Sequence, residues 1–138
     1  MNSVTLIAFG FGWMVVAALI GLYLGVKHDR HIGDLATAAG RGDLALYHQT
    51  FEAYKWRSSI HAHGMLFSLS AIVVGAVLPQ AGLSAPTMER LVAVLMIVTV
   101  IWTLAALGRI RPLMGLADIA FIGTMATVGW SMAGTLHI

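Results

Sequence analysis

The sequence predicts an all-α integral membrane protein, a bundle of four transmembrane helices with an amphipathic linker helix on the cytoplasmic side. Three observations predict this fold. Hydrophobic residues make up 59% of the 138 residues and charged residues only 10%, whereas about a quarter of a soluble domain is charged. Four apolar segments each approach the roughly 20 residues that cross a bilayer core. Basic residues gather in two of the connecting loops, as they do on the cytoplasmic side of membrane proteins.

The four predicted spans cover, in order, residues 5–26, 59–78, 91–107 and 116–136. Helices are the expected form, because lipid offers no partner for open strand edges. The first span follows an N-terminus without the basic segment of a signal peptide, so we expect it to be retained. Pro79 ends the second span and Gly108 follows the third. With no internal repeat and no sign of a second domain, we expect residues 1–138 to form a single membrane domain.

The basic residues orient the predicted bundle. Seven of the eight lie in the first and third loops, namely Lys27, Arg30, Arg41, Lys55, Arg57, Arg109 and Arg111. Arg90 alone lies on the other side. By the positive-inside rule, loops 27–57 and 109–115 are cytoplasmic and both termini are outside. A bacterial inner membrane is the expected location.

The linker, residues 27–57, is the long polar segment of the chain. Gly33, Gly40 and Gly42 interrupt its first half, and Asp43 is a suitable N-cap for a helix that begins at residue 44. From there to residue 56, apolar residues at spacings of three and four form one stripe. This amphipathic segment is expected either to lie on the cytoplasmic interface or to extend the second span inward.

Small residues predict where the helices approach each other. The first span contains Gly21 and Gly25 in a GxxxG pattern, and the fourth contains Gly123, Gly129 and Gly134. Small side chains let helix backbones come close in lipid. The pattern fits packing within one chain, and it also fits a homo-oligomer contact or docking in a larger membrane complex.

Composition excludes several kinds of function. The chain has no cysteine, which removes disulfides, thiolate metal sites, iron–sulfur clusters and covalently attached c-type haem. A net charge of +2 is too small and too scattered to indicate a nucleic-acid partner. No hydrolase motif and no phosphate-binding glycine loop is present. The chain is therefore not expected to be a stand-alone enzyme. If it has an enzymatic activity, the expected class is a haem-dependent oxidoreductase.

His61 and His63, in the second predicted span, are the candidate functional residues that stand out most. Ionisable side chains inside a bilayer are costly and usually functional, and a neutral imidazole is a common metal and haem ligand. Residues two apart on a helix are separated by about 200° of rotation. The two histidines are therefore expected to point in nearly opposite directions, so that each serves its own site or only one of them binds a group.

Other polar residues are expected at the same membrane face. His28 and His31 follow the first span, and Asp118 begins the fourth at a depth similar to that of the histidine pair. The Asp118 carboxylate is expected either to accept the Nδ1–H of one histidine or to pair with Arg57 or Arg111.

A separate metal pair is possible in the linker, where His48 and Glu52 are four residues apart and share a helix face. A continuous helix would place His48 roughly 22 Å from His63. Met65, four residues after His61, offers a thioether to haem or copper. His137 is predicted to be interfacial, at the opposite end of the bundle.

The string His61-Ala62-His63 resembles the His-x-His helix of the haem–copper oxidase and nitric oxide reductase catalytic subunits. The longer string His-Ala-His-Gly-x-Leu-Phe, residues 61–67, is similar to segments in NnrS-like haem–copper membrane proteins. The resemblance covers about eight residues and implies b-type haem ligated by His61 or His63. The further ligand would be His28, His31, water or a histidine of a neighbouring chain. Propionates would then pair with Arg57, Arg109 or Arg111. Those subunits have about a dozen spans and take further histidines from several helices, a pattern that this chain lacks.

Three functions follow from these observations. The first is a small haem b-binding membrane protein that acts in electron transfer, gas sensing or haem handling. The second is a non-enzymatic accessory or assembly subunit of a membrane complex, in which the histidines are structural. The third is a non-haem metal-binding or metal-transport protein that uses copper or another transition metal, with His61, His63, His48 and Glu52 as ligands.

Overall fold

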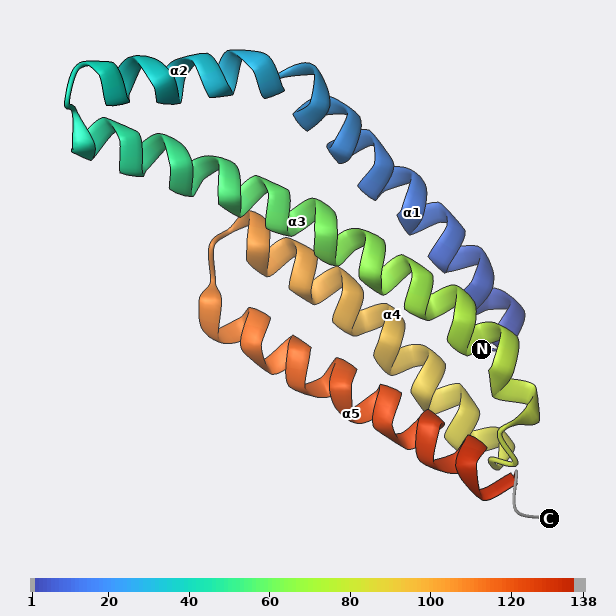
Figure 1. Cartoon of the computed structure of the whole chain (residues 1–138). Helices are drawn as coiled ribbons and strands as arrows, with labels where there is room; N and C mark the ends of the chain where they lie inside the picture. Colours follow the sequence, from blue (N-terminus) through green and yellow to red (C-terminus); the bar gives the residue numbers. More distant parts are fainter. Residues whose placement is uncertain (1, 136–138) are drawn as a thin grey trace.

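The structure, a computed structural model, describes residues 2–135 and is almost entirely helical in this part (Figure 1). Its elements are α1 (Ser3–Val26), α2 (His28–Gly40), α3 (Leu44–Val77), the short 3₁₀ helix η1 (Leu78–Gln80), α4 (Ala85–Leu107) and α5 (Arg111–Thr135). The all-helical class predicted from the sequence is confirmed for these residues.

Within residues 2–135, four helical segments are long and apolar enough to cross a membrane: α1, α3 with η1, α4 and α5. They contain the four predicted spans, except that residue 136 and His137 lie outside the described residues. The third and fourth helices begin earlier than predicted, at Ala85 and Arg111. A proline follows each of these residues, and proline is well tolerated in the first turn of a helix because the N–H that it lacks has no partner there.

The helix α3 is continuous over 34 residues. Asp43 caps its start, because the carboxylate accepts a 3.0 Å hydrogen bond from the Leu46 backbone N–H. The predicted linker helix over residues 44–56 is therefore the first part of α3 and is continuous with the second predicted span. This continuity agrees with the alternative in which the segment extends that span, whereas its position relative to a membrane stays a prediction.

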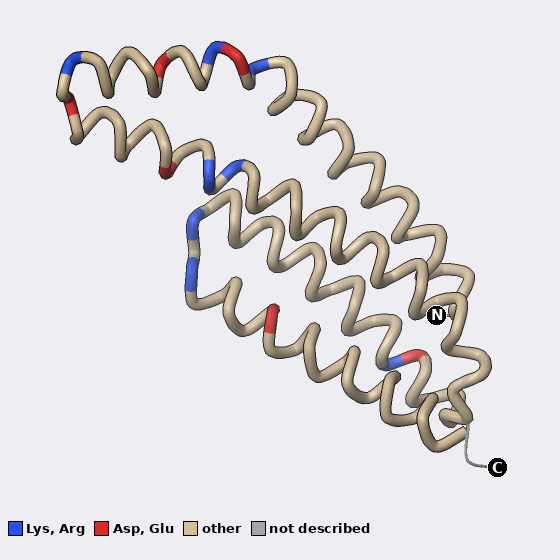
Figure 2. The backbone as a smooth tube through the Cα atoms, viewed as in Figure 1, with Lys and Arg blue, Asp and Glu red and all other residues tan. Residues whose placement is uncertain are grey.

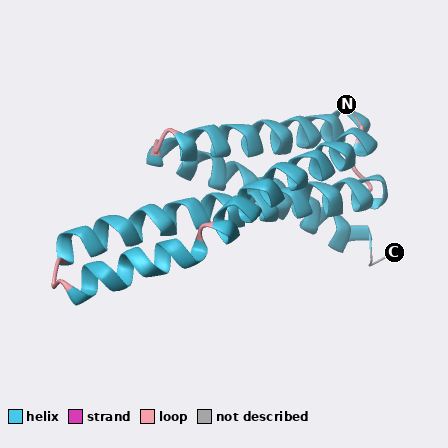
Figure 3. Ribbon diagram, turned by 90° about the horizontal axis from the view of Figure 1, so that it is seen from above, coloured by secondary structure: helices cyan, strands magenta, loops and turns pink. Residues whose placement is uncertain are grey.

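The helix α2 was not predicted, because glycines 33, 40 and 42 suggested an irregular segment. Gly33 lies inside α2, and the turn to α3 uses Gly42 at φ 67°, a conformation that suits glycine. Together α2 and the first part of α3 form a helical hairpin that projects beyond the four-helix part (Figure 3). The first predicted loop, residues 27–57, is therefore mostly helical.

The helices α1 and α3 are packed backbone against backbone. A Cβ atom added to Gly10 would lie 2.9 Å from the Ser68 carbonyl oxygen, and one added to Gly75 would lie 2.9 Å from that of Ser3. These glycines are therefore required by the close approach of the two helices, as small residues are in membrane bundles.

Two apolar clusters join α3 to the other helices. One contains Leu6, Ala71, Val74, Leu78, Val92, Leu95 and Val128, and the other Ile60, Phe67, Val98, Trp102, Ala106 and Ala117. The Trp56 indole N–H also donates a 3.0 Å hydrogen bond to the Ala106 carbonyl. Because α3 takes part in both clusters and in the contact with α1, it is the central helix of the bundle.

Charged residues lie mainly at one end of the molecule (Figure 2). This end holds the α1–α2 junction, the hairpin and the loop between α4 and α5, whereas one basic position lies near the start of α4. The structure thus places the residues of the predicted cytoplasmic loops together. The direction in which the bundle crosses a membrane stays a prediction.

Two glycines of α1 provide a matched test of this packing. Gly10→Ala is expected to lower the free energy of unfolding by about 1–3 kcal/mol, because the new methyl group meets the backbone of α3. Gly12→Ala is expected to be neutral or slightly stabilising, since nothing lies within 4 Å of its Cβ position. Thermal unfolding in detergent micelles measures both, and equal destabilisation by the two variants would contradict the packing described.

Candidate functional site

His61 and His63 leave α3 in opposite directions, as the spacing predicted. The His61 Nδ1 atom lies 2.8 Å from the Ala17 carbonyl oxygen of α1. The His63 ring stacks on Trp102 of α4, with ring centres 4.2 Å apart and planes 13° from parallel. The two imidazoles therefore connect the central helix to two different neighbours.

The His61 ring lies against the backbone of α1. A Cβ atom added to Gly21 would be 2.5 Å from the imidazole Cε1 and 2.9 Å from Nδ1. One turn further along α3, the backbones stay close, because a Cβ on Gly64 would be 3.1 Å from that of Ala17. Gly21 of the GxxxG pattern thus serves packing within the chain, whereas Gly25 has nothing within 4 Å.

The tautomer of both histidines follows from their partners. The His63 Nδ1 atom lies 2.9 Å from the Ser59 carbonyl oxygen and 3.3 Å from its hydroxyl. A carbonyl only accepts hydrogen bonds, so the bonds to Ala17 and Ser59 require a proton on each Nδ1. In the neutral rings, each Nε2 then carries the lone pair. The hydrogen bonds of both rings to the described residues involve Nδ1 and leave Nε2 without one.

Asp118 does not bond to either histidine. It lines a groove of about 420 Å³ between α3 and α5, together with Ser59, Trp56 and Arg111. The prediction that Asp118 accepts a histidine Nδ1–H is wrong, because main-chain carbonyls of Ala17 and Ser59 take both of these protons. The alternative ion pair with Arg57 or Arg111 is also not formed among the described residues.

His28 and His31 lie beside Tyr54 rather than beside the histidine pair. The His31 ring stacks on Tyr54 at 4.5 Å, and His28 Nδ1 lies 3.2 Å from the tyrosine hydroxyl. Tyr54 precedes His61 by seven residues, which is roughly 10 Å along the helix. The two histidines of α2 are therefore not placed to act as a second axial ligand opposite His61.

The linker pair His48 and Glu52 is exposed on α3. His48 meets Tyr47 edge-on, and a Glu52 carboxylate oxygen lies 3.7 Å from Lys55 Nζ. Among residues 2–135, no group of three or more histidine, aspartate or glutamate side chains is arranged to hold a metal ion. The metal pair stays a prediction.

A b-type haem would need a histidine Nε2 that faces a cavity of a few hundred cubic ångströms. Grooves of about 470, 420 and 340 Å³ are present in the described part of the chain, and neither His61 nor His63 lines any of them. The protonation state of the two rings suits ligation, but their position within one chain does not provide room for the macrocycle. The described residues of a single chain thus do not bring either Nε2 atom to the wall of one of these grooves.

The aromatic partners of the histidines were not predicted from the sequence. Tyr54 packs against His31 of α2. Apart from the size of its side chain, nothing in the sequence indicated that Trp102, inside the third span, contacts a histidine. Its indole nitrogen is buried without a hydrogen-bond partner among the described residues, and its ring is the surface on which His63 lies.

Comparisons with known proteins identify no relative. No known protein family, no curated protein and no solved structure matches the chain.

The two glycines of the GxxxG pattern distinguish packing within the chain from contact between copies. Gly21→Ala is expected to displace the His61 ring and to lower the free energy of unfolding by about 1–2 kcal/mol. Gly25→Ala is expected to have little effect, because its Cβ position is open. Thermal unfolding and cross-linking in micelles measure stability and association. Unchanged stability of Gly21→Ala would contradict the packing assigned to Gly21, and a loss of association in Gly25→Ala would assign Gly25 to a contact between copies.

Proposed function

We propose that this chain is a non-enzymatic accessory subunit of a membrane complex, in which His61 and His63 are structural residues that fix its helices. The observation that carries the proposal is the hydrogen bond from His61 to the Ala17 carbonyl of α1. It uses the polar end of an intramembrane side chain to connect two spans, which is a known use of polar residues in membrane bundles.

Energetics support a structural role for this hydrogen bond. An interhelical hydrogen bond in a membrane protein contributes about 0.6–2 kcal/mol. Removing the acceptor would leave the Nδ1–H unsatisfied beside apolar side chains, which costs about 1–3 kcal/mol. His61 is thus stable at this position only while α1 lies against α3, so the residue favours one arrangement of the two helices.

The outer faces of α1 and α5 support a role within a larger assembly. Many of their large apolar side chains are exposed, including Leu22 and Leu19 on α1 and Ile122 and Trp130 on α5. Trp130 has 85% of its surface exposed. In a membrane these faces contact lipid or another subunit, and a rigid bundle presents them in a constant orientation.

Substitutions of His61 test the structural role. His61→Ala is expected to lower the free energy of unfolding by about 1–3 kcal/mol and to weaken association with the complex. His61→Asn places an N–H donor near the position of Nδ1, so it is expected to restore part of this loss. His48→Ala is the control, because His48 is exposed on the same helix. Thermal unfolding and co-purification measure the two effects.

The role would be contradicted if His61→Ala left stability and association unchanged while it removed a bound chromophore. Haem binding is the second candidate function, and the bare Nε2 atoms of His61 and His63 favour it. Because one chain does not provide the cavity, a haem would need a second chain to complete the site. Absorbance of the purified protein separates the two candidates, since a colourless protein is expected and a Soret band would favour haem.

A further inference from the structure

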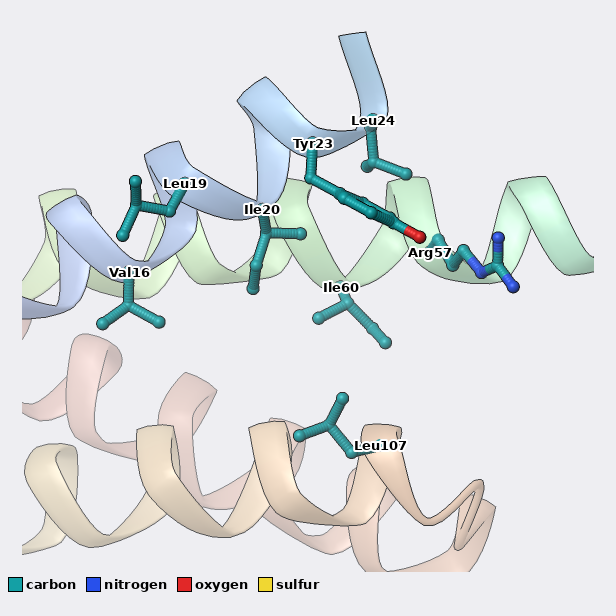
Figure 4. A pocket seen from close by; sticks show the side chains of 8 residues that line it. All are labelled: Val16, Leu19, Ile20, Tyr23, Leu24, Arg57, Ile60 and Leu107. Carbon is teal, nitrogen blue, oxygen red and sulfur yellow. The ribbon is translucent and has the colours of Figure 1, made fainter. Parts of the chain in front are cut away.

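An apolar groove runs along α1 and is bounded by α3 and α4 (Figure 4). Its volume is about 470 Å³, and its walls include Val16, Leu19 and Ile20 of α1 and Leu107 of α4. The groove is open to the outside of the bundle, so in a membrane it faces the acyl chains. Its dimensions lie within the range of small-molecule pockets.

The groove becomes polar at the charged end of the molecule. Figure 4 shows the Tyr23 hydroxyl and the Arg57 guanidinium at the same end of the row of apolar side chains. Lys27 lies next to them, since its Nζ is 2.9 Å from the Tyr23 hydroxyl. This is also the end that holds the basic loops (Figure 2).

A second, basic pocket begins where the apolar groove ends. Its volume is about 290 Å³, and it is lined by Lys27, Arg30, His31, Asp34 and Arg57. Arg57 lines both cavities, so they are neighbours on the two sides of one guanidinium. Three permanent cations face one carboxylate here, which leaves a net positive charge.

The cations of this pocket are available to a ligand. Among the described residues, none of Lys27, Arg30 and Arg57 forms an ion pair with a protein carboxylate. Arg57 is exposed between the apolar groove and the basic pocket, and arginine binds phosphate through two parallel hydrogen bonds. An occupant that fits both cavities has an anionic head and an apolar chain.

We propose that these two cavities form a binding site for an anionic phospholipid of the surrounding bilayer. The phosphate lies against Arg57 with Lys27 and Arg30 around it, and one acyl chain follows the groove past Ile60 and Leu107. The level of the site fits this occupant, because the basic end of a bundle lies at the headgroups of the cytoplasmic leaflet. This proposal does not depend on the role assigned to the histidines.

Native mass spectrometry of the whole chain in a neutral detergent tests the site, with phosphatidylglycerol and phosphatidylcholine as the two probes. The wild type is expected to retain one phosphatidylglycerol in preference to phosphatidylcholine. Arg57→Gln is expected to weaken phosphatidylglycerol binding about tenfold, as the loss of one charge-assisted contact predicts. Leu107→Trp fills the groove without a change of charge, and it is expected to weaken binding as well.

Arg90→Gln and Arg111→Gln are the controls, because these arginines line neither cavity. Both are expected to retain the lipid. The proposal would be overturned if the controls lost as much lipid as Arg57→Gln, or if both phospholipids bound equally. It would also be overturned if the wild type formed a dimer without bound lipid and Leu107→Trp dissociated this dimer. A second copy of the chain would then occupy the groove. Arg57→Lys keeps the positive charge, so it is expected to retain more lipid than Arg57→Gln. If Arg57→Gln does not fold, Leu107→Trp provides the test.

Discussion

The contact between α1 and α3 leaves no room for side chains at Gly10 and Gly75 and little room at Gly64, and the surroundings of His61 follow from it. Because the two backbones approach so closely, the Ala17 carbonyl comes within reach of the His61 imidazole. The opposite side of α3 is then free to pack on α4 through Ile60, Phe67 and Trp102. A bulkier interface would move α1 outward and would remove the partner of His61.

The continuity of α3 is the second consequence of this arrangement. A helix of 34 residues is about 51 Å long, which is longer than a hydrocarbon core of about 30 Å. Its first part therefore extends beyond the apolar region and carries Tyr54 and Arg57 to the basic end of the bundle. There it holds α2 through the His31–Tyr54 stack and provides the guanidinium that lies between the apolar groove and the basic pocket.

Much of the fold could be predicted from the sequence, because hydrophobic length and charge distribution act locally. The four long helices follow from runs of apolar residues, and the opposite directions of His61 and His63 follow from helix geometry alone. The helix α2 could not be predicted, since glycines 33 and 40 disfavour a helix and only its packing on α3 compensates for them. Which helix faces each histidine depends on contacts between distant segments, as for Ala17 and Trp102. The Asp118 prediction was wrong for the same reason, because a similar depth does not place two side chains together.

The protonation of the His61 ring tests the connection between α1 and α3, because the bond to Ala17 requires the proton on Nδ1. Nitrogen NMR of the protein labelled at histidine, in lipid bilayers at neutral pH, distinguishes the two ring nitrogens. We expect a protonated Nδ1 coupled to the Ala17 carbonyl and a bare Nε2 for His61, with the His61 signals assigned by their loss in the His61→Asn variant. A proton on Nε2 with a bare Nδ1 would contradict the proposed connection between α1 and α3.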